Sequence, residues 1–162
     1  MQNKTNVKTV ILASFVSVLL AEALGFLSSV LAGDIRGKFE LLTKPPLTPP
    51  GWVFGPVWIV LYALMGIAAA LVFSVTAPGK EKRKALVFYG IQLVLNFIWS
   101  IVFFGTANYL AGCFVIAGLA VFLVLTFIEF RKASPAASFL LIPYMAWICF
   151  AAYLTVGVTI LN

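Results

Sequence analysis

The chain has no histidine and only two cysteines among its 162 residues. Without an imidazole there is no histidine-based acid–base catalysis and no histidine ligand for a metal or haem iron. Cys113 and Cys149 both lie inside apolar stretches, where a cysteine acts as a small apolar side chain. We therefore expect both cysteines to fill space between helices, and we expect no metal site and no cofactor.

Charged residues are also scarce: they make up 10% of the chain, whereas about 25% is usual for a soluble domain. Hydrophobic residues make up 63%, and the mean hydropathy is +1.10. The apolar residues form five runs, and each run has the roughly 20 residues that a helix needs to cross a bilayer. These runs are 10–32, 52–74, 85–104, 110–130 and 136–161. The composition therefore predicts an all-α integral membrane protein, with a single domain over 1–162 that is a bundle of five transmembrane helices.

The net charge of +6 is spread over short loops. Eight basic residues fall on the side of the N-terminus: Lys4, Lys8, Lys80, Lys82, Arg83, Lys84, Arg131 and Lys132. The other side has Arg36, Lys38 and Lys44. By the positive-inside rule, the N-terminus lies inside and the 33–51 connection and the C-terminus lie outside. We interpret these charges as orientation signals and expect the lipid bilayer, not a nucleic acid, as the surrounding partner.

Proline is concentrated in one connection, where Pro45, Pro46, Pro49 and Pro50 stand close together. Proline fixes φ and has no backbone N–H, so we expect this strap (residues 45–50) to be stiff and extended like polyproline. Its carbonyl groups would lack partners in hydrocarbon, which places the strap at the membrane surface. A short amphipathic helix is expected just before it, near 37–43. The 33–51 connection is therefore predicted to form a lid.

Polar residues inside the third run share one face of a helix, because Gln92, Asn96 and Ser100 recur every four residues. Two explanations are open. These side chains can make hydrogen bonds between helices, each worth about 0.6 kcal/mol. Alternatively, they can be the polar anchor of a ligand cavity.

Two acidic residues lie within apolar runs. Glu22 in the first run is either a proton site or the partner of a group on a neighbouring helix, since an intramembrane carboxyl group needs a partner or a purpose. Glu129 lies near the end of the fourth run beside Arg131 and Lys132, and we expect it to reach the membrane interface.

The four tryptophans can surround one outward-facing space if the helices alternate in direction. Trp52 and Trp58 lie in the outer part of the second run, Trp99 lies near the outer end of the third, and Trp147 lies deeper in the fifth. An interfacial tryptophan belt would explain the first two but not the last. Pro143 should kink the fifth helix and widen the space. We therefore predict an aromatic cavity suited to a flat, apolar ligand.

Three ordered motifs cover nearly the whole chain. The first runs from Lys44-Pro45-Pro46 through Pro49-Pro50-Gly51-Trp52-Val53-Phe54-Gly55-Pro56-Val57-Trp58 to Tyr62 and Met65-Gly66. The second combines Gln92-Leu93, Asn96, Trp99-Ser100 and Phe103-Phe104. The third combines Pro143-Tyr144, Trp147, Phe150-Ala151 and Leu154. Together they resemble the signature of the translocator protein family, also called the tryptophan-rich sensory protein family, whose mammalian members were known as peripheral benzodiazepine receptors.

The resemblance implies a five-helix bundle, usually a homodimer, that binds porphyrins such as protoporphyrin IX and other flat apolar ligands. It implies a tetrapyrrole sensor, scavenger or carrier. The compact sequence shows no organelle signal, which favours a bacterial cytoplasmic membrane. The ligand site implied by the motifs comprises Trp52, Phe54, Tyr62, Asn96, Trp99, Trp147, Phe150, Ala151 and Leu154. Three further residues of the same motifs complete the expected ligand site: Ser100, Phe103 and Tyr144.

Two alternative functions remain open. The first is light-dependent degradation of protoporphyrin IX as a substrate, with Trp52 and Trp147 as the participating residues. The second is passive transport of apolar small molecules. One departure from the family pattern bears on the site, because the family's asparagine after Leu154 is Thr155 here. Pairs of small residues, Gly66 with Ala70 and Ala107 with Ala111, suit either dimer contacts or packing within the chain.

Overall fold

The computed structural model of the chain describes residues 7–162. Lys4, one of the basic residues expected to orient the helices, lies outside this part. Within it, five segments are long and apolar enough to cross a membrane. They are Val7–Ala32, Gly51–Val75, Lys80–Gly105, Tyr109–Ala133 and Pro135–Leu161. The predicted bundle of five membrane-spanning helices is therefore confirmed.

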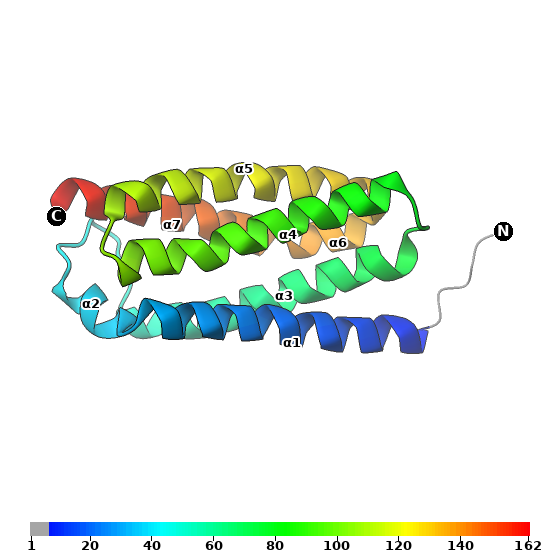
Figure 1. The fold of residues 1–162 in the computed structure, drawn as a ribbon, viewed down its shortest axis with the longest axis horizontal. Helices are drawn as coiled ribbons and strands as arrows, with labels where there is room; N and C mark the ends of the chain where they lie inside the picture. The colour runs from blue at the N-terminus through cyan, green and yellow to red at the C-terminus, as the bar shows by residue number, and fades with distance from the viewer. Residues whose placement is uncertain (1–6) are drawn as a thin grey trace.

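The long helices lie side by side along one axis (Figure 1). They are α1 (Val7–Ala32), α3 (Phe54–Val75), α4 (Lys80–Ser100), α5 (Tyr109–Ala133) and α7 (Ile142–Leu161), with the short α6 (Pro135–Leu140) before α7. α1 packs on α3, α4 on α5, and α5 on α7. Large apolar side chains remain exposed on the outside of the bundle, because lipid takes the place of water there.

The two ends of the bundle differ. α1 begins at one end, while the strap connection and the C-terminus lie together at the other (Figure 1). We call these the start end and the strap end. The strap end carries α2 (Ile35–Leu41), close to the helix expected near 37–43. Asp34 begins it by accepting a hydrogen bond from the backbone N–H of Gly37 at 2.9 Å.

The strap differs from the expected extended polyproline conformation. Leu47 has a φ of 65°, in the left-handed region, and the hydroxyl of Thr48 donates to the carbonyl of Pro45 at 2.6 Å. A proline followed by a residue with positive φ is typical of a type II turn. The strap therefore reverses direction at Pro46 and Leu47, and the prediction of a continuous extended segment is wrong there.

Tyr153 of α7 and Asn162, which directly follows α7, hold the 33–51 connection against the bundle. The hydroxyl of Tyr153 donates to the carbonyl of Pro46 at 2.8 Å. The side chain of Asn162 accepts from the N–H of Thr43 and donates to its carbonyl, both at 2.9 Å. Gly157 allows the approach, because a Cβ there would lie 2.6 Å from the Pro45 ring. We call the bonds made by Tyr153 and Asn162 the strap latch.

Glycine brings α1 and α3 into close contact. A Cβ on Gly66 would lie 2.6 Å from the Cα of Val18 on α1, so the two backbones nearly touch. Ala70, one turn further along α3, is also buried. This pair of small residues therefore serves packing within one chain.

The last span is interrupted as the sequence predicts. α6 ends at Leu140, α7 begins at Ile142, and Pro143 stands in the first turn of α7. The missing N–H of a proline is tolerated there, because the first N–H groups of a helix have no partner within it. The break between α6 and α7 therefore lies just before the aromatic residues of α7.

Candidate ligand site and polar core

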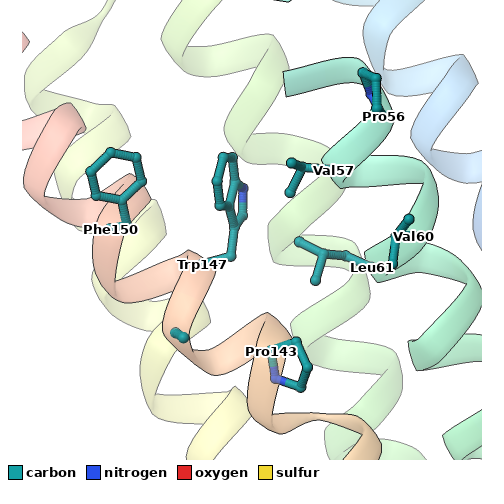
Figure 2. Close-up of a pocket in the computed structure, with 8 residues that line it drawn as sticks. Pro56, Val57, Val60, Leu61, Pro143, Trp147 and Phe150 are labelled. Carbon is teal, nitrogen blue, oxygen red and sulfur yellow. The ribbon is translucent and has the colours of Figure 1, made fainter. Parts of the chain in front are cut away.

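A cavity of about 520 Å³ lies between α3 and α7 (Figure 2). This volume falls within the range of about 300–1,000 Å³ that is common for small-molecule sites. The lining residues are apolar or aromatic: Pro56, Val57, Val60, Leu61, Pro143, Ala146, Trp147 and Phe150. The cavity therefore suits an apolar ligand.

Helical spacing brings the α7 residues of the cavity together. Trp147 follows Pro143 by four residues, and Phe150 follows Trp147 by three, so the three side chains share one face. Figure 2 shows the indole of Trp147 standing between Phe150 and Val57, with its nitrogen on the α3 side. Within the described residues, this buried nitrogen, Nε1, has no hydrogen-bond partner. This donor is unpaired, but neighbouring atoms cover it, so it does not lie on the open surface of the cavity.

A row of aromatic rings leads from the cavity to the strap end. Trp147 contacts Phe54 with ring centroids 5.7 Å apart, and Phe54 contacts Phe39 of α2 at 5.1 Å. On the other side, Trp147 contacts Phe150 at 5.6 Å, and Phe150 stacks on Tyr153. Tyr153 is also part of the strap latch. The cavity and the strap are therefore linked by continuous ring contacts.

A polar network fills the middle of the bundle. The hydroxyl of Tyr62 donates to Oδ1 of Asn96 at 2.6 Å, and Nδ2 of Asn96 donates to the hydroxyl of Tyr144 at 2.8 Å. Tyr144 in turn donates to Oε1 of Gln92 at 3.0 Å. All four side chains are buried. Of the two explanations left open by the sequence, the structure shows hydrogen bonds between helices for Gln92 and Asn96; Ser100 makes none of these bonds.

Three of the four tryptophans lie outside the lining of the cavity. Trp58 packs against Tyr62 and Tyr144, at 5.5 and 6.3 Å between ring centroids. Trp99 stacks on Phe103 at 5.3 Å, and Trp52 is 70% exposed. The cavity between α3 and α7 therefore has one indole in its lining, that of Trp147, and not the four that the sequence led us to expect. Trp58 and Trp99 instead pack against the buried core that contains Tyr62 and Tyr144.

The remaining predicted site residues have other surroundings. Phe103 lines a second, smaller cavity of about 180 Å³ near Lys38 and Tyr109. Ala151 and Leu154 are buried in α7. Thr155 is satisfied within its own helix, since its hydroxyl donates to the carbonyl of Ala151 at 2.8 Å. Whether these residues contact a ligand stays a prediction.

The two intramembrane acids differ in their contacts. Glu22 is partly exposed on α1, and among the described residues no hydrogen bond or ion pair reaches its carboxyl group. Glu129 is 6% exposed and lies near the end of α5, at the start end of the bundle; that it reaches the membrane interface stays a prediction. The ammonium groups of Lys84 and Lys132 cover it, at 2.8 and 3.0 Å. It remains buried because these lysines, rather than water, supply its hydrogen bonds.

Sequence reasoning missed the aliphatic part of the cavity, namely Val57, Val60, Leu61 and Ala146. Aliphatic residues that line a cavity and those that face lipid look alike in an apolar run. Only the helical phase separates them: Ala146 lies three residues after Pro143 and one before Trp147, on the cavity face of α7.

Five apolar helices with a tryptophan-bearing cavity between two of them define an integral membrane protein with a candidate site for an apolar small molecule. The sequence profile of the TspO/MBR family matches residues 17–161, and the chain belongs to this family. It is 40% identical to the tryptophan-rich protein TspO of Chlorobaculum tepidum over 144 residues, which are 88% of this chain and 91% of the relative. It is 39% identical to that of Archaeoglobus fulgidus over 153 residues (94% and 98%) and 38% identical to the human translocator protein over 141 residues (83% and 82%).

Proposed function

We propose that this membrane protein binds porphyrins such as protoporphyrin IX, and similar flat apolar ligands, in the cavity between α3 and α7. The observation that carries the proposal is an apolar cavity of about 520 Å³ with the rings of Trp147 and Phe150 in its wall. Aromatic side chains offer a flat surface on which a conjugated macrocycle can stack. The protein would then act as a tetrapyrrole sensor, scavenger or carrier.

Two further features support a ligand of this kind. The Nε1–H of Trp147 has no partner and is covered by neighbouring atoms, so a ligand that turns the indole would let this buried donor reach an acceptor atom at the ligand edge. The rest of the wall offers few polar atoms, which suits a ligand whose faces are apolar.

We also propose an orientation in a bacterial cytoplasmic membrane, with the start end inside and the strap end outside. The distribution of basic residues supports it: the loops and helix ends at the start end carry Lys80, Lys82, Arg83, Lys84, Arg131 and Lys132. A membrane-impermeant thiol reagent would test it, since a cysteine introduced at exposed Leu47 should react from outside intact cells and one at exposed Lys80 should not.

A titration with protoporphyrin IX tests the ligand. The change in porphyrin absorbance on binding is followed for the full chain in detergent, and for the Trp147→Phe and Trp52→Phe variants. We expect Trp147→Phe to weaken binding about tenfold, because it removes both ring area and the indole donor. Trp52→Phe is the matched control and should bind like the wild type, since Trp52 lies outside the cavity lining and is largely exposed.

Two outcomes would contradict the proposal. Unchanged binding in Trp147→Phe would show that the ligand does not enter the cavity between α3 and α7. A loss confined to Trp52→Phe would place the ligand at the strap end instead.

A further inference from the structure

A buried carboxylate holds two lysines side by side at the start end of the bundle. The ammonium groups of Lys84 on α4 and Lys132 on α5 both bond to the same oxygen, Oε1 of Glu129. The lysine side chains are 50% and 59% exposed, whereas that of Glu129 is 6% exposed. The carboxylate of Glu129 therefore lies beneath the two ammonium groups, which are on the surface of the protein. We call these three residues the lysine clamp.

The clamp presents two cations at a fixed spacing. Both lysine nitrogens bond to one oxygen, so they lie close to each other. This spacing is already present in the packing of α4 against α5, and binding an anion requires no movement of either helix. A free lysine would lose side-chain entropy on being held in this way, but here Glu129 has already ordered both. Two adjacent ammonium groups match an anion with several oxygens, and lysine is a common phosphate ligand.

Apolar side chains extend from the clamp along the two helices. The ammonium of Lys84 lies 5.6 Å from the ring centroid of Phe88, which contacts Phe122 of α5 at 6.0 Å. Val87 on α4 and Ile128, four residues before Lys132 on α5, are exposed large apolar residues. A ligand with a phosphate at one end and hydrocarbon chains at the other would contact both parts.

The surrounding charge favours an anion. In the described part of the chain, Lys80, Arg83 and Arg131 lie at the same end and form none of the ion pairs of the structure. Glu81 and Glu129 are the acids at this end, against seven basic residues.

We propose that the lysine clamp, together with the apolar faces of α4 and α5 beside it, binds the phosphate headgroup of an anionic membrane lipid. The position at the ends of membrane-spanning helices, and the apolar faces next to the ammonium groups, favour a lipid over free phosphate. This site lies at the opposite end of the bundle from the strap and is separate from the cavity between α3 and α7 (Figure 1).

Native mass spectrometry of the full chain in neutral detergent tests the proposal. The fraction of lipid-bound protein is measured against added phosphatidylglycerol, with phosphatidylcholine of the same acyl chains in parallel and inorganic phosphate as competitor. We expect phosphatidylglycerol to bind more tightly than phosphatidylcholine, and phosphate to compete only weakly. Lys132→Gln should weaken phosphatidylglycerol binding about fivefold, because one of the two ammonium groups held on Glu129 for the phosphate is lost.

Two variants separate a preorganised clamp from general attraction by positive charge. Glu129→Gln makes the protein more positive but removes the carboxylate that holds the lysines, so the clamp predicts weaker binding, whereas general attraction predicts tighter binding. Lys80→Gln is the matched control: it removes the same charge at the start of α4 without touching Glu129. The clamp predicts little change for it, whereas general attraction predicts the same loss as for Lys132→Gln.

Lys132→Arg guards against a merely structural effect, since it keeps the cation and should retain binding. Thermal unfolding without added lipid identifies any variant that is not folded. If Glu129→Gln is not folded, the losses of phosphatidylglycerol binding in Lys84→Gln and Lys132→Gln, compared with that in Lys80→Gln, test the clamp instead. The proposal is overturned if phosphatidylglycerol and phosphatidylcholine bind equally, if Lys80→Gln costs as much as Lys132→Gln, if folded Glu129→Gln binds more tightly, or if inorganic phosphate displaces the lipid fully.

Discussion

The hydroxyl of Tyr62 donates a hydrogen bond to the side-chain amide of Asn96 across 2.6 Å in the buried centre of the bundle. The same amide donates to Tyr144, so one side chain on α4 connects α3 and α7. Apolar packing between membrane helices specifies their register only weakly, because lipid tails are as apolar as the side chains. The tyrosine–amide bonds therefore help to fix how three helices sit against one another, including the two that form the cavity.

We predict that Tyr144→Phe destabilises the bundle by about 1 kcal/mol, since two hydrogen bonds of roughly 0.6 kcal/mol each are lost. The midpoint of thermal unfolding in detergent should fall accordingly. Tyr109→Phe is the matched control, because the structure gives the Tyr109 hydroxyl no hydrogen bond within residues 7–162, and this variant should unfold like the wild type. Equal midpoints for the two variants would show that the network contributes no stability.

Contact between α1 and α3 depends on Gly66. In Gly66→Ala, the new Cβ would lie 2.6 Å from a backbone atom of Val18, which cannot move without displacing α1. We expect destabilisation of about 1–3 kcal/mol, as for overpacking in other cores. Gly90→Ala is the control, since a Cβ there meets nothing within 4 Å, and it should be neutral or stabilising by up to about 1 kcal/mol. Thermal unfolding of both variants measures the difference, and a Gly66→Ala protein as stable as Gly90→Ala would contradict the close approach.

The strap latch should control the motion of the strap. Asn162→Ala removes both bonds to the backbone of Thr43, so we expect a spin label at exposed Leu47 to become more mobile. The label is attached to Leu47→Cys in a background in which Cys113 and Cys149 are replaced by serine, and mobility is read from the electron paramagnetic resonance line shape. Asn108→Ala serves as the control: it removes a hydrogen bond to the N–H of Ala111 at the same end, and the label should not respond. An unchanged line shape in Asn162→Ala would mean that the latch does not restrain the strap.

The sequence was sufficient for the features that depend on local chemistry. Run length alone located the five spans, and Pro143 predicted the break between α6 and α7, because hydrophobic thickness and proline geometry need no tertiary contact. The strap was harder: four prolines predicted stiffness, but the turn depends on Leu47 adopting a positive φ, which is uncommon for a residue with a branched side chain.

The candidate site was predicted only in part, because it depends on which helices become neighbours. The spacing of Gln92 and Asn96 showed a polar face but could not say that Tyr62 and Tyr144 would satisfy it. Trp58 and Trp99 pack against the core that contains these tyrosines, and the cavity lies between α3 and α7. Trp147 was identified from its depth in the membrane, whereas the valines and Ala146 of the wall carry no local signal.

A substitution that fills the cavity without touching its aromatic residues gives the strictest test of the site. Ala146 is one of the residues that line the cavity and directly precedes Trp147, so in Ala146→Phe the new ring occupies the space that a ligand would need. We expect protoporphyrin IX binding, followed by absorbance, to fall at least about tenfold. The midpoint of thermal unfolding should stay near that of the wild type, because Ala146 is exposed and the ring enters an open cavity.

Cys149→Phe supplies the control: it adds a ring of the same kind to exposed Cys149, on the same helix but outside the cavity lining. It should bind porphyrin as the wild type does, since it leaves the space between α3 and α7 open. If Ala146→Phe also bound normally while remaining folded, the ligand would have to occupy another part of the molecule, because a phenyl ring and a macrocycle cannot share that space. The smaller cavity that Phe103 lines beside Lys38 would then be the place to examine.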